Sequence, residues 1–482
     1  MRKQRMNAIL VPLAAVLLAC GSVQAQTTWT WINTTDTANW STVGNWDLGT
    51  VPNADGANVV LDNYANMHAS THGIFVDGAD YVIGDLASIQ TVRGLLIKSA
   101  SGGRLIFQNT EEGVSTITVN PGVRGMTLIA TVRLANDLNI ISQGTHSGSP
   151  VAMTIGAVTH HTAGVKTITI DSASTSGVVQ NQGNLTGAVR VEHNAPNAVL
   201  SMSEFNNTHT GGTAVNAGLM TVGNTALGSG KLELNGGNMR LDRNNATYTY
   251  FSGATEVNSN ATINFFHADV TANLGSLAIV GDRTLTASGA AAGGNTLVFG
   301  TTTLAGNATF NVTSGSSNPN TLRLGAVSDG ASDYNVTKTG SGILQLNAAN
   351  TYSGNTTIAA GTLRLGASGT IANSPRISLG TVASQGTLDV TNKTAFTVGA
   401  SQSLAGHGTL AAGAASVTVD GTLAPGTSTG VNTITVNLDG ALALASTATL
   451  VIDAADGAVA KLEVGGGGSV TLDGTLKMRG QV

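Results

Sequence analysis

The sequence predicts an all-β protein built as a β-solenoid with a tryptophan-rich cap at its N-terminal end. Glycine is abundant, at 62 of 482 residues, whereas proline is limited to 8 residues and charged residues to 10%. Short runs that alternate apolar and polar residues recur between turn residues, as in "STITVN", "KLELNG" and "TITVNL", and this alternation is typical of strands. One unit also occurs twice, as expected of a stacked repeat architecture.

Residues 1–25 have the pattern of a secretory signal peptide. Three basic residues, Arg2, Lys3 and Arg5, precede a short apolar stretch, and a small-residue cleavage pattern ends at Ala25. We therefore expect Gln26 to begin the mature protein, and the chain to be secreted or placed on the cell surface.

A second processing pattern overlaps the first. The segment Leu17-Leu18-Ala19-Cys20 resembles a bacterial lipobox, in which a lipidated Cys20 would be the first mature residue, although Leu18 stands where a small residue is usual. Cys20 is also the only cysteine, so a mature chain that begins at Gln26 has no disulfide. Its stability must then come from extensive regular pairing.

Residues 26–125 are expected to form the cap and the first rungs. They contain all four tryptophans, Trp29, Trp31, Trp40 and Trp46. We interpret these rings as closing the open end of a repetitive core, because terminal repeats must differ from interior ones. A carbohydrate-stacking patch is the alternative interpretation of the same residues.

Residues 126–430 are expected to form the solenoid, and residues 431–482 a C-terminal solenoid segment, either complete or truncated. The repeated unit lies near 207–223 and again near 338–366, where "NTHTGGTAVNAGLMTVG" aligns with "NTYSGNTTIAAGTLRLG". Strands this rich in Gly and Thr are marginal alone, but stacked rungs share a continuous core. A series of β-sandwiches is disfavoured because aromatic residues make up only 4% of the chain.

The second copy resembles the autotransporter-associated β-strand repeat. The positions that carry this resemblance are Lys338, Gly340, Gly342, Leu344, Leu346, Asn350, Tyr352, Gly354, Thr356, Ile358, Ala360, Gly361 and Leu363. The resemblance implies a right-handed parallel β-helix that is exported to the bacterial surface, where members of the family act mostly as adhesive, matrix-like or display scaffolds. Autotransporters also carry a C-terminal translocator barrel, which is not recognisable before Val482, so we expect either another export route or a fragment.

The candidate chemical motifs are better explained as structure. "GTSTG" at 426–430 matches a nucleophile elbow around Ser428, but a strand pattern follows it and no histidine comes after His407. His160 and His161 would point to opposite faces of a strand, and the pair Glu111–Glu112 lacks the carboxylate density of a calcium site. We therefore expect no catalytic, cofactor-binding or metal-binding residue.

These observations together predict a non-enzymatic secreted or cell-surface β-helix that acts as an adhesive or structural passenger-type scaffold. The alternative is a carbohydrate-binding or carbohydrate-modifying β-helix. The expected partner is a surface polysaccharide or the surface of a host or neighbouring cell. We expect no nucleic-acid partner, because no basic cluster follows the N-terminal Arg2, Lys3 and Arg5. Contact with a membrane is expected only through export or a lipid anchor at Cys20.

Overall fold

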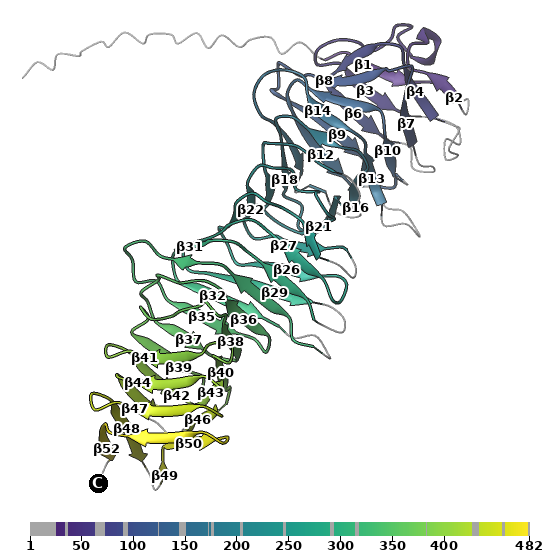
Figure 1. Cartoon of the computed structure of the whole chain (residues 1–482). Coiled ribbons are helices and arrows are strands. Elements are labelled where there is room, and N and C mark those ends of the chain that lie inside the picture. The colour runs from purple at the N-terminus through teal and green to yellow at the C-terminus, as the bar shows by residue number, and fades with distance from the viewer. Residues whose placement is uncertain are drawn as a thin grey trace, which may run out of the picture.

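The computed structural model describes residues 26–480 apart from 34–36, 63–72, 90–94, 124, 144–150, 172, 175–177, 203–205, 244–246, 290–293, 314–317, 382, 427–432 and 456–457. The expected signal peptide, Cys20 and Ser428 lie outside the described residues. The described residues form one elongated stack of strands, with the N-terminal strands at one end and the C-terminal strands at the other (Figure 1). Helical structure among them is limited to one 3-10 turn, η1 (Val43–Asn45), and no described helix has the length and apolar character needed to cross a membrane.

The strands pair in parallel along five ladders, which we call sheets A to E. Sheet A contains β1 (Thr28–Trp31), β3 (Asn58–Leu61), β6 (Asp85–Ser88), β9 (Val114–Val119), β12 (Asp137–Ser142), β15 (Lys166–Ile170), β18 (Val189–His193), β20 (Thr213–Val215), β22 (Leu232–Leu234), β25 (Thr255–Val257), β28 (Leu277–Val280), β31 (Thr302–Ala305) and β34 (Val327–Ser328).

Sheet B runs along the whole described stack. Its strands are β2 (Thr37–Asn39), β4 (Gly73–Asp77), β7 (Leu95–Ala100), β10 (Met126–Leu128), β13 (Val151–Ile155), β16 (Val178–Asn181), β19 (Val199–Met202), β21 (Leu219–Val222), β23 (Asn238–Leu241), β26 (Ala261–Phe265), β29 (Arg283–Gly289), β32 (Ala308–Val312), β35 (Val336–Thr339), β37 (Thr356–Ile358), β39 (Arg376–Leu379), β42 (Ser403–Gly406), β45 (Thr422–Pro425), β48 (Thr449–Ala455) and β52 (Thr475–Gly480). A short antiparallel strand, β49 (Ala458–Val459), folds back on β48.

Three shorter ladders complete the rungs. Sheet C contains β5 (Asp80–Ile83), β8 (Arg104–Phe107), β11 (Thr131–Leu134), β14 (Val158–His160) and β17 (Leu185–Thr186). Sheet D contains β24 (Thr247–Thr249), β27 (Thr271–Asn273), β30 (Thr296–Val298), β33 (Thr321–Leu324), β36 (Ile343–Leu346), β38 (Gly361–Leu365), β40 (Gly386–Asp389), β43 (Gly408–Gly413), β46 (Thr433–Leu438) and β50 (Lys461–Gly465). Sheet E contains β41 (Ala395–Val398), β44 (Ser416–Val419), β47 (Ala441–Leu444) and β51 (Ser469–Leu472).

This parallel pairing confirms the predicted β-solenoid and excludes β-sandwiches for the described strands. Each strand pairs with a strand of the next rung along the chain, and the sequence distance between partners varies. The rung that brings Asn238 opposite Leu219 is short, whereas the rung that brings Met126 opposite Leu95 is much longer. The extra residues are accommodated in the connections between strands, so the core strands keep a similar length.

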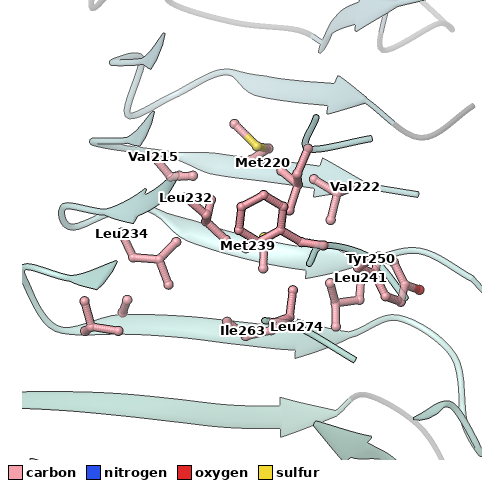
Figure 2. Packing of buried hydrophobic residues seen from close by; sticks show 14 of the residues in the cluster. Val215, Met220, Val222, Leu232, Leu234, Met239, Leu241, Tyr250, Ile263 and Leu274 are labelled. Atoms are coloured by element: carbon pink, nitrogen blue, oxygen red, sulfur yellow. The ribbon is translucent and has the colours of Figure 1, made fainter. Parts of the chain in front are cut away.

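Aliphatic side chains of successive rungs stack into columns inside the solenoid. Along sheet B, Met220 stands over Met239 and Val222 over Leu241, and all four are fully buried. Figure 2 shows these side chains pointing into one shared interior together with residues from sheet A. The alternation read from the sequence therefore places one face of each strand in the core.

A ladder of asparagines supports the turns that follow sheet A. The side-chain amide of Asn216 donates to Asn194 Oδ1 at 2.6 Å, Asn235 donates to Asn216 at 2.6 Å, and Asn258 donates to Asn235 at 2.9 Å. Each asparagine follows the end of a sheet A strand. Stacked amides of this kind fix the register between neighbouring rungs, because each one satisfies the next.

Three of the four tryptophans form the predicted cap. Trp31, Trp40 and Trp46 are 0–1% exposed, and the Trp46 ring lies 4.9 Å from Trp31 and 4.8 Å from Trp40 in edge-to-face geometry. Their indole N–H groups find backbone carbonyl partners, as buried tryptophans require. Trp29 differs, because it is only half-buried and donates to the Thr50 hydroxyl.

Candidate functional site: the two repeat seams

The two copies of the repeated unit lie where the solenoid loses one of its three faces. From β3 to β17 the chain visits sheets A, B and C in turn, and from β18 to β23 it visits only A and B. A cycle of sheets A, B and D then runs to β34, and from β35 to β40 the chain visits only B and D before sheet E begins at β41. We call β18–β23 seam 1 and β35–β40 seam 2.

Rungs in the seams are short, since each has two strands. In seam 1, a single strand, β20, separates the paired strands β19 and β21 along the chain. In seam 2, β36 alone separates the paired strands β35 and β37. The repeat is thus the unit that ends one face of the solenoid while the other two continue. The strand pattern alone does not reveal this, because it does not say which strands pair.

One asparagine in each copy closes the sheet that stops. In seam 2, Asn350 Oδ1 accepts from the Val327 amide at 2.8 Å, and its side-chain NH₂ donates to the Thr370 carbonyl at 2.8 Å. In seam 1, Asn207 accepts from the Leu185 amide at 2.8 Å and donates to the Ala226 carbonyl at 2.7 Å. Val327 belongs to β34 and Leu185 to β17, the last strands of sheets A and C.

The residue after each asparagine completes this closure. The backbone amides of Thr351 and Thr208 donate to the carbonyls of Val327 and Leu185, at 2.9 and 2.8 Å. One Asn-Thr dipeptide therefore takes the place of a whole strand. It hydrogen-bonds to the backbone N–H and C=O of Val327 or Leu185 in the preceding rung, and its asparagine side chain also donates to one carbonyl of the following rung. This is the physical reason for asparagine at the position, because its side chain carries both a donor and an acceptor.

A buried side chain two residues after each asparagine fills the space left by the missing strand. In seam 2 it is Tyr352, whose hydroxyl lies 2.8 Å from Thr356 Oγ1, and burial raises the pKa of this phenol. In seam 1 it is His209, whose Nε2 lies 3.1 Å from Thr213 Oγ1. Both side chains are 0–1% exposed, and both contact the equivalent threonine of their copy.

A second buried polar side chain lies under the next turn. Lys338 is 1% exposed, and its Nζ donates to the carbonyls of Thr339, Gly340 and Ala360 at 2.6, 2.7 and 3.2 Å. Burial lowers the pKa of Lys338 to about 8. The ammonium group supplies donors for carbonyls of the turn, so it acts as an internal cap.

In seam 1 the place of Lys338 is taken by His193. His193 lies opposite Val215 as Lys338 lies opposite Ile358, and both polar groups lie beside the equivalent glycines, Gly218 and Gly361. The gap-free alignment instead pairs Lys338 with Ala195. The stretch between this position and the asparagine that both copies share is longer in copy 1, which is why the sequence comparison missed the equivalence.

Two of the predicted glycines have a clear geometric requirement. Gly361 has φ +66°, and a Cβ there would lie 2.4 Å from the Gly340 carbonyl oxygen; Gly218 has φ +70° and would clash in the same way with Ala195. Gly354 lies so close to the rung below that a Cβ would stand 2.3 Å from the Tyr334 carbonyl oxygen. The expectation that Gly354 and Gly361 are backbone corners is consistent with these contacts.

The other predicted repeat residues surround the same seam. Gly340 and Gly342 form the turn between β35 and β36, Leu344 and Leu363 are fully buried on adjacent strands of sheet D, and Thr356 begins β37. The structure brings all of the predicted repeat positions, from Lys338 to Leu363, into two successive rungs. They form a packing and pairing unit, and no exposed reactive group belongs to it.

The remaining candidate residues do not assemble with the seams. His160 accepts from the Ala188 amide through Nδ1 and is half-buried, while His161 is exposed. Within the part of the chain that the structure describes, no three His, Cys, Asp or Glu side chains are grouped as a metal site would require. A shallow hollow of about 210 Å³ lies beside the N-terminal strand, lined by Gln26, Thr27, Trp29, Ala54, Asp55, Gly56, Ala57, Thr110 and Glu111.

The comparison with protein families agrees with this division of the chain. The family model described as the passenger-associated-transport-repeat matches residues 198–222 and 336–365, which lie in seam 1 and seam 2. Neither the search of curated proteins nor the search of solved structures found a match. The resemblance inferred from the motif is confirmed: the chain is an autotransporter-associated repeat protein with a β-helix fold.

Proposed function

We propose that this passenger-type scaffold is non-enzymatic and adhesive or structural, and that it works outside the cell by presenting the long outer faces of its stack to other surfaces. The observation that carries the proposal is the continuity of sheet B, which pairs from β2 to β52. At about 4.8 Å per rung, this ladder spans about 90 Å. A ladder of this length holds its outer side chains in fixed rows, and such rows suit contact with an extended partner.

Support for export comes from the repeat itself, since passenger-associated repeats suggest an exported passenger domain. The expected location can be tested by expressing the full chain in a bacterial host and treating intact cells with protease. Cleavage of the chain on intact cells, with a periplasmic marker left uncut, is expected of a surface protein. An uncut chain inside intact cells would contradict surface exposure.

The adhesive role is tested with beads coated with the purified chain. We expect these beads to attach to polysaccharide-coated or cell-coated surfaces more strongly than beads carrying the heat-unfolded chain. Equal attachment would overturn the adhesive role. Release of soluble sugar from any polysaccharide in the same panel would overturn the non-enzymatic assignment.

A second candidate function rests on the hollow beside Trp29. An aromatic ring next to Asp55 and Glu111 is a combination that suits a sugar, because the ring can stack on a pyranose and carboxylates accept bonds from its hydroxyls. Asp55 is already engaged, since it accepts from the Thr110 amide at 2.9 Å and from Gln108 Nε2 at 3.1 Å. Glu111 is exposed and remains the residue better placed to meet a ligand.

If the hollow binds a sugar, binding should depend on Trp29 and should not depend on the buried tryptophans of the cap. A glycan array probed with the chain and with Trp29→Ala separates the two functions. Binding lost in Trp29→Ala, with the fold intact, would favour the carbohydrate-binding alternative. Trp40→Ala and Trp46→Ala are poor probes of a sugar site, because both rings are buried in the cap.

A further inference from the structure

The two seams share one design but differ at their buried polar positions. Seam 1 has His193 and His209 where seam 2 has Lys338 and Tyr352. Both histidines are 0% exposed. Seam 1 therefore encloses two side chains that, when exposed to water, gain a charge on mild acidification, whereas the corresponding side chains of seam 2 do not change charge in that range.

No negatively charged group in the described part of the chain acts on either histidine to stabilise a positive charge. His209 contacts the neutral Thr213 hydroxyl through Nε2, and no hydrogen-bond partner meets its Nδ1 among the described residues. Neither ring nitrogen of His193 meets one there. The backbone of Ala198 and Leu219 lies close enough to His193 to favour its charged form, but burial outweighs this and lowers the pKa of His193 to about 4. Burial alone lowers the pKa of His209 to about 4.

The charged groups around seam 1 lie on its outer surface. On β18, Arg190 and Glu192 alternate with the inward-facing Val191 and His193, and Arg190 pairs with Glu192 and with Glu233 of β22. On the neighbouring strands, Lys231 pairs with Glu256 across the outside of sheet A, Lys166 is half-buried on β15, and the half-buried His160 on β14 accepts from the Ala188 amide. Strands β19, β20 and β21 carry no charged residue. None of these groups acts on the charge of either buried ring.

We propose that seam 1 is an acid-sensitive joint: protonation of His193 and His209 separates the two-strand rungs of seam 1, while seam 2 and the three-strand rungs remain paired. The inference rests on the packing of seam 1 and does not depend on the adhesive role. Seam 1 is suited to opening because the strand that would cover its third side is missing and is replaced by one Asn-Thr dipeptide.

The sign of the effect follows from proton linkage. Each histidine binds a proton more weakly in the folded seam than in the opened chain, so the opened form takes up protons as the pH falls and the folded form loses stability. With a pKa near 6.5 when opened and about 4 when folded, each histidine favours opening about twentyfold at pH 5 relative to pH 7. The two histidines together give a factor of roughly five hundred if they act independently.

Hydrogen–deuterium exchange of the full chain between pH 7 and pH 4 tests the joint, because seam 2 in the same sample is an internal reference for the pH dependence of exchange. We expect peptides from 189–234 to lose protection between pH 6 and pH 4, relative to peptides from 336–379. Equal pH dependence of the two seams would overturn the proposal.

Variants that swap buried residues between the two seams test the same proposal. His209→Tyr combined with His193→Gln is expected to remove the acid sensitivity of seam 1, since tyrosine is the residue that fills this place in seam 2. The reciprocal Tyr352→His is expected to make seam 2 open about twentyfold more at pH 5 than at pH 7. If the double variant is unfolded at pH 7, Tyr352→His decides alone, and an unchanged pH dependence of seam 2 in that variant would reject the mechanism.

Discussion

Replacing Asn350 with alanine is the most direct test of how a seam closes an interrupted sheet. The Asn350 side chain bonds to two backbone groups, the Val327 amide and the Thr370 carbonyl, each at 2.8 Å. Alanine removes both bonds and adds no new contact. We expect seam 2 to loosen at the end of sheet A, while the columns of sheets B and D stay paired.

The magnitude follows from the burial of the two partners. Val327 is 1% exposed, so its amide cannot find water, whereas Thr370 is half-exposed and its carbonyl can be hydrated in part. A buried group left without a partner costs about 1–3 kcal/mol. The amide accounts for most of this cost and the carbonyl for less, so we expect the local free energy of opening to fall by about 2–3 kcal/mol.

Hydrogen exchange at the Val327 amide measures this quantity. A loss of about 2–3 kcal/mol corresponds to exchange that is faster by roughly 30- to 150-fold. Asn373→Ala is the matched control, because Asn373 is exposed and makes one long bond of 3.3 Å to the Thr351 carbonyl. Similar exchange in the two variants would show that the bonds of Asn350 do not stabilise the seam.

Three further changes test other parts of the structure. Gly361→Ala is expected to lower the free energy of unfolding more than Gly330→Ala. The two glycines have nearly the same φ, +66° and +68°, but only at Gly361 would the new Cβ meet carbonyl oxygens. Thermal unfolding of the two variants therefore measures the effect of crowding at equal backbone strain. Lys338→Met should destabilise seam 2 by about 2–4 kcal/mol, because three carbonyls lose their donor, and NMR of the wild-type chain should show Lys338 titrating near pH 8. Trp46→Ala should cost about 3–5 kcal/mol and expose the first rungs to protease, whereas Trp29→Ala should leave them protected; equal digestion would contradict the cap.

The sequence was sufficient to predict strands, their stacking and the cap, because alternation and glycine placement are local signals. It could not show that each repeat copy ends a face, since that depends on which strands pair across rungs of unequal length. The repeat residues themselves were identified, with Tyr352 near a turn and Ile358 and Leu363 facing the core. Their roles were not, because Asn350 bonds to backbone groups of neighbouring rungs, and Lys338 links the carbonyls of its own turn to the Ala360 carbonyl of the next rung.

His193 shows a different limit of sequence comparison. Its equivalence to Lys338 depends on strand register, and the longer connection in copy 1 shifts the alignment. Trp29 is the converse case, since composition groups it with the other tryptophans but its ring is only half-buried, at the edge of the buried cluster. In both cases the missing information is how the neighbouring rungs pack around the side chain.

The unequal length of the rungs has a mechanical consequence. Because the strands lie across the long axis of the stack, tension on the two ends would peel strands apart one rung at a time instead of shearing them all together. Each released rung would lengthen the chain in proportion to its residues, by roughly 65 Å for the rung from Leu219 to Asn238 and roughly 105 Å for the rung from Leu95 to Met126. A stretched molecule would therefore lengthen in steps whose sizes follow the order of its rungs, and rungs of both seams would be among the shortest steps.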